Sequence, residues 1–373
     1  MTVEPFPLIE LSGPAEQRGR HYGRQAARRI RRSIEHYSAQ LAADGHGTAT
    51  VHGWVRDFLP RIEAFDADYI AEMRGIAAGA EVAFEDIVLI NARTEVLQLG
   101  KRQAAARKDP DGCTGVVVMP EASADGSLIH AQNWDWKSEC AETGVVLRIR
   151  RDDGPDILTF VEAGGLARAG LNAAGIAITA NYLQSDRDYR SLGVPLALIR
   201  RKVLEKEFVA QAFQAVYATV KSASNNVIVS QAGGIAINFE CAPDETFQVH
   251  ATNGLIVHAN HFISPVALSK LKDAGVATTP DSLYRDLRVR QLLEARKGGL
   301  DVQAVKDALF DDYQSPWAVC RPPRLNAAGN LSATVAMLVM QPAKGVLEVA
   351  PLPALNRQFT RYELFSNAEA RAA

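Results

Sequence analysis

The sequence lacks a long apolar run, a strong charge of either sign and a leader-like N-terminus. No stretch approaches the roughly 18 consecutive apolar residues of a membrane-spanning helix, so we expect none. The net charge of −2 over 373 residues gives no reason to expect a nucleic-acid or membrane partner. No basic segment followed by an apolar one opens the chain, so we expect no secretory signal and a cytoplasmic location.

Cysteine is scarce, with four residues at positions 113, 140, 241 and 320. None forms a CxxC pair and the spacings fit no zinc pattern, so no metal site is expected. A glycine-rich stretch at 163–170 lacks the GxGxxG spacing and the following helix that bind phosphate groups. We therefore expect no metal or organic cofactor, and we interpret Cys140, Cys241 and Cys320 as reduced packing thiols.

Hydrophobic periodicity divides the chain into a helical first third and a mixed remainder. Helical spacing covers 14–43, 51–80 with a break near Pro60, and 84–99, followed by a polar linker at 99–112. After Cys113, short strands alternate with turns, and helices are expected at 194–207, 208–220, 282–297 and 301–310. Hairpin-linked strands covered by helices predict a layered α+β fold and not a βαβ nucleotide fold.

Cys113 stands where the polar linker ends and a strand begins. Asp125-Gly126 is a hairpin signal, so the strand leaving Cys113 should pair with the strand that carries Asp135. Cross-strand neighbours lie about 5 Å apart, and we therefore expect the thiol and the carboxylate to meet on one face of the sheet. The alternative is a packed cysteine and a surface aspartate.

Gly112 gives this cysteine a further possibility. If the Cys113 thiol attacked the Gly112 carbonyl, the amide would become a thioester that water can cleave; glycine offers no side chain to obstruct the attack. Cleavage would free the α-amino group of Cys113, whose ordinary pKa of about 7.7–8.0 suits it to accept the thiol proton.

Several short motifs, in this order, resemble one known family: SGPAEQRGRHYGRQ, LINARTE, DGCTG, QNWDW, GVPLALIRRKVLE, HANHF, SLYRDLRVRQLL and VCRPP. The family is the acyl-coenzyme A:6-aminopenicillanic acid acyltransferases, or C45 peptidase family, within the N-terminal nucleophile (Ntn) hydrolases. The resemblance implies a four-layer αββα sandwich with two antiparallel sheets. It also implies self-cleavage into an α chain, 1–112, and a catalytic β chain, 113–373, that remain one globular heterodimer.

The resemblance also assigns roles to residues. It implies that Cys113 is the nucleophile, that Gly112 supplies the scissile carbonyl and that Asp135 orients the cysteine and its amine. Asn260 of HANHF resembles the asparagine whose side-chain N–H stabilises the oxyanion, and Asn181 of TANYL resembles the residue that completes the oxyanion hole.

Other positions are assigned with alternatives open. Arg285 resembles an arginine near the cysteine, with Arg288 of equal type beside it. Trp134, Tyr182 and His261 are candidate substrate-binding residues. Trp134 also fits a hairpin core, and a strand-end histidine is more often a satisfied core or rim residue.

We predict an Ntn-type enzyme that cleaves the amide of a small N-acyl compound through an acyl-thioester on Cys113. Acyl transfer from a coenzyme A thioester to a small amine is the alternative. A non-catalytic small-molecule binder and an uncut thiol enzyme with His261 as base are the other hypotheses. The penicillin-forming relative has a serine–arginine pair where this chain has Asn330 and Leu331, which argues against penicillin-type substrates.

Overall fold

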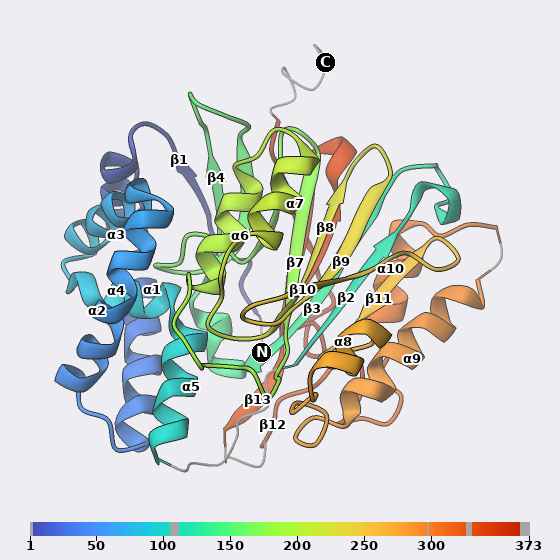
Figure 1. The fold of residues 1–373 in the computed structure, drawn as a ribbon. Helices are drawn as coiled ribbons and strands as arrows, with labels where there is room; N and C mark the ends of the chain where they lie inside the picture. The colour runs from blue at the N-terminus through green and yellow to red at the C-terminus, as the bar shows by residue number, and fades with distance from the viewer. Residues whose placement is uncertain (1–2, 105–111, 297, 326–329, 366–373) are drawn as a thin grey trace.

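Two β-sheets packed face to face form the centre of the molecule (Figure 1). The computed structural model describes residues 3–104, 112–296, 298–325 and 330–365. Sheet A has the strand order β1-β4-β5-β6-β7-β8-β9-β10, and sheet B has the order β11-β2-β3-β13-β14-β15, with β12 paired to β13. Neighbouring strands are antiparallel except β1 and β4, which are parallel.

The strands begin and end as follows. Sheet A is built from β1 (Leu8–Leu11), β4 (Gly144–Ile149), β5 (Ile157–Glu162), β6 (Ala169–Asn172), β7 (Ile176–Tyr182), β8 (Asn225–Gln231), β9 (Ile235–Cys241) and β10 (Thr246–Val249). Sheet B is built from β2 (Gly112–Val118), β3 (Ile129–Lys137), β11 (Leu255–His258), β12 (Arg324–Leu325), β13 (Leu331–Gln341), β14 (Val346–Pro351) and β15 (Thr360–Glu363).

Helices cover the outer face of each sheet. The helices that precede β2 in the chain are α1 (Ala15–Ala43), α2 (Thr48–Phe65), α3 (Ala67–Ala80), α4 (Phe84–Asn91) and α5 (Arg93–Ala104). The later ones are α6 (Leu196–Leu204), α7 (Val209–Tyr217), α8 (Pro265–Lys270), α9 (Asp281–Glu294) and α10 (Val302–Leu309). Helices α6 and α7 contact strands β6 to β9 of sheet A, and α9 and α10 contact β2, β3, β11 and β13 of sheet B. The predicted four-layer αββα architecture is therefore confirmed.

Helices α1 and α3 cross at very short range because glycines lie at the crossing. A Cβ on Gly19 would lie 2.0 Å from the Glu72 carbonyl oxygen, and one on Gly75 would lie 2.1 Å from the Glu16 carbonyl oxygen. Only glycine permits such a backbone approach. The helices then share one buried core with β4, β5 and the start of β2.

Two expected helix boundaries in the first third are wrong. Pro60 lies inside α2, on its exposed side, and the buried face opposite it maintains the helix despite the missing N–H. The break comes instead at Asp66, whose side chain caps the N–H of Asp68 at 2.9 Å. The helix expected over 84–99 is divided at Ala92, because the Asn91 side chain bonds the loop after β5, including the N–H of Leu166 at 2.9 Å.

Candidate active site

The β2–β3 hairpin fixes the position of Cys113. In its antiparallel register Gly112 lies opposite Asp135, and Cys113 lies opposite Trp134. Asp135 is thus one residue from the position opposite Cys113, as predicted. The linker residues 105–111 lie outside the described structure.

The expectation that the thiol and the carboxylate share a sheet face is wrong. Directly opposite residues point to the same side of an antiparallel pair, and successive residues alternate. Cys113 and Trp134 therefore share the face toward sheet A, where Gly115 meets Ile228 and Thr179. Gly112 and Asp135 share the other face, toward α9. The carboxylate therefore lies on the side of the Gly112 backbone and not beside the thiol.

The backbone N–H of Cys113 donates to Oδ1 of Asn260 at 2.7 Å. The same oxygen accepts a 2.8 Å hydrogen bond from Arg285, while Nδ2 of Asn260 donates to the Tyr182 carbonyl at 2.9 Å. These partners orient the amide so that its oxygen faces Cys113. The structure thus brings Asn260, Arg285 and Cys113 together, with the amide oxygen as an anchor for the cysteine nitrogen.

Arg285 is fully buried and links α9 to the start of β2. Its guanidinium donates to the carbonyl of Cys113 and to Oγ1 of Thr114, the latter at 2.8 Å. Its Nε donates to Asp281 at 3.0 Å. Arg288 instead pairs with Asp311 at 2.7 Å on a more exposed side of the helix. Of the two candidates, Arg285 is the one at Cys113.

A chain of buried charges extends from Asp135 to Arg285. Oδ1 of Asp135 accepts from Thr334 at 2.7 Å, and Oδ2 lies 3.3 Å from Nε of Arg321. Arg321 also pairs with Asp281, which in turn pairs with Arg285. Burial raises the pKa of Asp281, but the two arginines outweigh it, so the pKa lies below its ordinary value. Alternating charges keep Asp135 and the Cys113 backbone in a fixed relation.

Gly112 fits closely into this network. A Cβ at position 112 would lie 2.7 Å from Oδ2 of Asp135 and 2.9 Å from Nη1 of Arg321. Oδ2 of Asp135 is buried and, within the described part of the chain, accepts no hydrogen bond. Besides its ion pair with Arg321, this oxygen lies against the Gly112 position and can accept a hydrogen bond.

Asn181 lies between the sheets on the Cys113 face. It donates to the His258 carbonyl at 2.8 Å and accepts from Gln132 at 2.8 Å. Its Nδ2 lies 3.6 Å from the Cβ position of Gly115, two residues along β2 from the cysteine. Nδ2 carries a second hydrogen besides the one bonded to His258, so an oxyanion role for Asn181 does not require a partner to be exchanged.

The three candidate substrate-binding residues have different surroundings. Trp134 is fully buried beneath the guanidinium of Arg168, 3.9 Å from the ring centroid. Tyr182 offers its carbonyl to Asn260, and its hydroxyl accepts from Gln184 at 2.8 Å.

His261 bonds Ser282 through Nδ1 at 2.8 Å. Ser282 also accepts from the N–H of Asn260 at 2.6 Å, so His261 and the Asn260 backbone share this hydroxyl. Burial, followed by His258 and Arg285, lowers the pKa of His261 to about 4, which makes it a weak base at neutral pH.

Sequence reasoning missed the residues that hold the site from outside the hairpin. Asp281, Thr334 and Arg321 come from α9, β13 and the segment before β12, and Ser282 follows Asp281. Arg321 stood in the motif VCRPP and Ser282 in SLYRDLRVRQLL, but no spacing rule connects Arg321 to Asp135, 186 positions earlier. Such long-range partners become visible only once the fold is known.

Comparison with known protein families assigns the chain to one of them. The model of the acyl-coenzyme A:6-aminopenicillanic acid acyltransferase family matches residues 122–350, a range that includes Asp135, Asn181, Asn260 and Arg285. The chain belongs to this family. It is 29% identical over 315 residues to the 40 kDa form of acyl-coenzyme A:6-aminopenicillanic-acid-acyltransferase of Emericella nidulans, covering 84% of each chain. The family assignment places the chain among Ntn-type hydrolases and acyltransferases.

Solved structures with similar folds include three at low sequence identity. A conjugated bile acid hydrolase from Clostridium perfringens is 13% identical with a TM-score of 0.48, over 68% of this chain and 92% of that one. The Caenorhabditis elegans N-acylethanolamine-hydrolyzing acid amidase ortholog is 16% identical with a TM-score of 0.43, over 62% and 93%. Penicillin V acylase from Agrobacterium tumefaciens is 15% identical with a TM-score of 0.43, over 68% and 86%.

The described residues contain neither a candidate membrane-spanning helix nor a candidate metal-binding cluster. None of their helices is long and apolar enough to cross a membrane. No group of three or more His, Cys, Asp or Glu side chains among them could hold a metal ion.

Proposed function

We propose that the chain matures by cleaving its own Gly112–Cys113 bond and then hydrolyses the amide of a small N-acyl compound. In the first step the Cys113 sulfur attacks the Gly112 carbonyl carbon, and the departing Cys113 nitrogen takes a proton. Water then hydrolyses the thioester, which leaves a Gly112 carboxylate, a free thiol and a free amine. The products, 1–112 and 113–373, remain together as a heterodimer.

The observation that carries the proposal is the hydrogen bond that fixes the position of the Cys113 nitrogen. Asn260 accepts its N–H at 2.7 Å, and the spare Oδ2 of Asp135 faces the Gly112 backbone next to it. If this bond were cut, the Cys113 nitrogen would lose its covalent bond to Gly112. The freed amine could then donate a hydrogen bond to the Asp135 carboxylate. That arrangement would orient its lone pair to take the thiol proton.

In the proposed turnover the thiolate attacks the substrate carbonyl and the protonated amine gives its proton to the departing amine. Asn260 and Asn181 are our candidates for stabilising the oxyanion, each through an Nδ2 donor. Water then hydrolyses the acyl-thioester on Cys113 and releases the acid. Water competes with any amine at this stage, so a small amine acceptor, with a coenzyme A thioester as donor, remains the second candidate.

The relative's name describes an enzyme acting with 6-aminopenicillanic acid and acyl-coenzyme A. The resemblance implies an arginine where this chain has Leu331, and its absence favours a different amine. We expect the reaction to take place in the cytoplasm without a metal or organic cofactor.

The test is to trap the acyl-enzyme. Purified protein is mixed with a panel of N-acyl amides and acyl thioesters, quenched in acid and analysed by intact mass spectrometry beside Cys113→Ala. A hydroxylamine-sensitive acyl adduct on the fragment beginning at Cys113, together with released amine, is expected. An adduct that persists in Cys113→Ala, or turnover without Cys113, would contradict the proposal.

A further inference from the structure

A small cavity of about 30 Å³ lies on the Cys113 side of sheet B, between α5, β5 and α6. Its lining includes five charged side chains, from Arg93, Glu95, Glu162, Arg168 and Arg200. The volume is enough for about one water molecule or one small polar group. The lining comes from both sides of the proposed cut, since Arg93 and Glu95 belong to α5.

The cavity is connected to the cysteine through Trp134. Trp134 is the cross-strand partner of Cys113, so their side chains lie on the same sheet face. The Arg168 guanidinium covers the Trp134 ring at 3.9 Å, and Arg168 and Arg200 line the same cavity. Arg200 lies close enough to Cys113 for a thiolate there to interact with it electrostatically.

The negative charges in the lining are largely compensated. Glu162 pairs with Arg93 at 2.8 Å and also accepts from Tyr37. Glu95 accepts the N–H of Leu196 at 2.8 Å, and burial raises its pKa. Within the described ranges no carboxylate forms an ion pair with Arg200, which therefore leaves the cavity electropositive.

Among the described residues Glu95 acts on Arg200 electrostatically but does not form an ion pair with it. Nothing in the described ranges forms a hydrogen bond or ion pair with it, and its Nε is buried without an acceptor. Burial, then the neighbouring Arg168 and Arg93, lowers its pKa to about 9. This half-buried guanidinium has several donors left for an anion, and arginine suits the two oxygens of a carboxylate.

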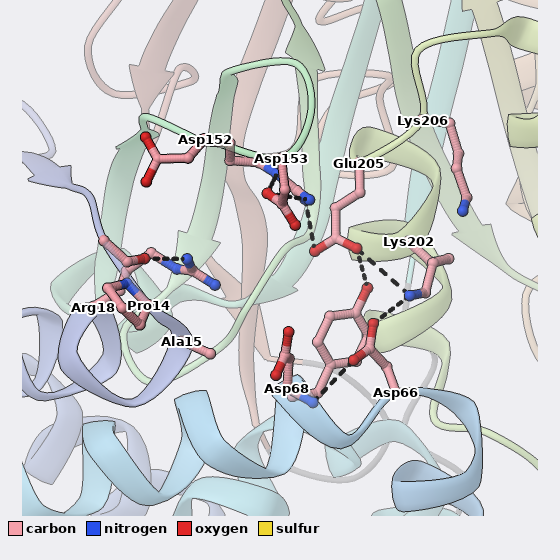
Figure 2. Close-up of a pocket in the computed structure, with 13 residues that line it drawn as sticks. Pro14, Ala15, Arg18, Asp66, Asp68, Asp152, Asp153, Lys202, Glu205 and Lys206 are labelled. Atoms are coloured by element: carbon pink, nitrogen blue, oxygen red, sulfur yellow. Dashed lines mark hydrogen bonds and ion pairs between the residues drawn. The ribbon is translucent and has the colours of Figure 1, made fainter.

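In a second, wider charged cleft of about 360 Å³, the charged side chains pair with one another (Figure 2). There Lys202 bridges Asp66 and Glu205, and Arg151 pairs with Glu205 at 3.1 Å. Its main charges thus neutralise one another. In the cavity beside Cys113, no carboxylate of the described residues forms an ion pair with Arg200.

We infer that Arg200, with Arg168 beside it, binds a carboxylate of the substrate, so that the enzyme acts on N-acyl compounds that carry a carboxylate near the scissile amide. The inference rests on the proposed function and narrows its substrate class. N-acyl amino acids place the carboxylate on the amine side, and monoamides of dicarboxylic acids place it on the acyl side.

A labelling experiment tests the pocket without any substrate. Cys113 of the processed protein is alkylated with iodoacetate or with neutral iodoacetamide, and the ratio of the two rates is measured by mass spectrometry. We expect Arg200→Met to lower the iodoacetate-to-iodoacetamide ratio about 10-fold or more, and Arg200→Lys to lower it less. Arg24→Met, which removes an exposed arginine of α1, should leave the ratio unchanged.

Substrate pairs then test specificity. N-acyl amino acids and dicarboxylic monoamides are compared with their methyl esters, and Arg200→Met should reduce kcat/KM roughly 10- to 100-fold for the acids but little for the esters. An unchanged labelling ratio, or equal losses for acid and ester, would overturn the carboxylate site while the amidase proposal stands. A ratio that responds to Arg200 in a protein that turns over neither acid nor ester would support the site and overturn the amidase.

Discussion

Asp135 lies directly across the antiparallel ladder from Gly112, and its Oδ2 is 2.7 Å from the position that a Cβ on Gly112 would occupy. The residue before the proposed cut is thus fitted against the carboxylate that would receive the new amine. On the other side of the proposed cut, Asn260 accepts a hydrogen bond from the backbone N–H of Cys113. This placement of the Gly112–Cys113 bond leads to the first prediction.

Gly112→Ala should slow self-cleavage roughly 10-fold or more, since overpacking a closed site costs about 1–3 kcal/mol. Processing is followed by densitometry on denaturing gels over time. Gly53→Ala is the matched control, because a Cβ there meets nothing within 4 Å; it lies within α2 and should leave processing unchanged. Equal processing rates in wild type and Gly112→Ala would show that the close fit at 112 has no role.

Asn260→Ala should lower the turnover of processed enzyme about 10²–10³-fold, the usual cost of losing an oxyanion donor of about 2.7–4 kcal/mol. Asn260→Asp keeps an oxygen toward Cys113 and Arg285 but removes the Nδ2 donor. If the donor matters most, both variants lose turnover alike. If Asn260→Asp retains most of the activity, the asparagine acts only by anchoring the cysteine nitrogen.

Thr334→Val removes the 2.7 Å hydrogen bond to Asp135 with little change in shape. We expect a stability loss of about 1.5–3 kcal/mol, typical of a hydrogen bond to a charged group, and slower processing. Thr334→Ser, which retains the hydroxyl, should restore both. Chemical denaturation measures the first effect and gel densitometry the second; a valine variant that processes like wild type would separate Thr334 from the cleavage site.

Two buried histidines make stability depend on pH. Burial lowers the pKa of His130 to about 3, and burial with His258 and Arg285 lowers that of His261 to about 4, against about 6.5 in the unfolded chain. The unfolded state therefore binds more protons below about pH 6.5. The stability contributed above that pH is lost as the pH falls toward 4, by up to about 1.4 kcal/mol per pH unit for each histidine.

The measurement is urea denaturation between pH 4.5 and 7.5. His130→Gln should flatten the decline in the free energy of unfolding below pH 6.5. His21→Gln, at an exposed position of α1, should not. Parallel curves for wild type and His130→Gln would show that His130 is not held neutral by the fold.

The features of the site that could be predicted from the sequence are those that depend on residues close together in the chain. The β2–β3 pairing followed from a local turn signal, and Gly126 indeed adopts a positive φ of 74°. The face of Asp135 did not follow, because a shift of one residue in register moves a side chain to the other side of the sheet. Arg321 and Arg200 gave no local signal, since a single arginine reads as surface until the tertiary structure buries it.

Helix boundaries show the same limit. A proline such as Pro60 commonly ends a helix, but the packing of the buried face of α2 continues the helix past it. The division at Ala92 depends on Asn91 bonding a loop more than 70 positions away. Local propensity predicted which segments are helical, and tertiary contacts decided where they end.

Self-cleavage between Gly112 and Cys113 is the central claim, and intact mass spectrometry of the purified protein beside Cys113→Ala tests it most directly. The account predicts two fragments in the wild type, 1–112 and 113–373, and one full-length chain in the variant. A wild-type chain that stays whole on long incubation would contradict the free-amine mechanism, and fragments that also appear in Cys113→Ala would contradict the role of the thiol.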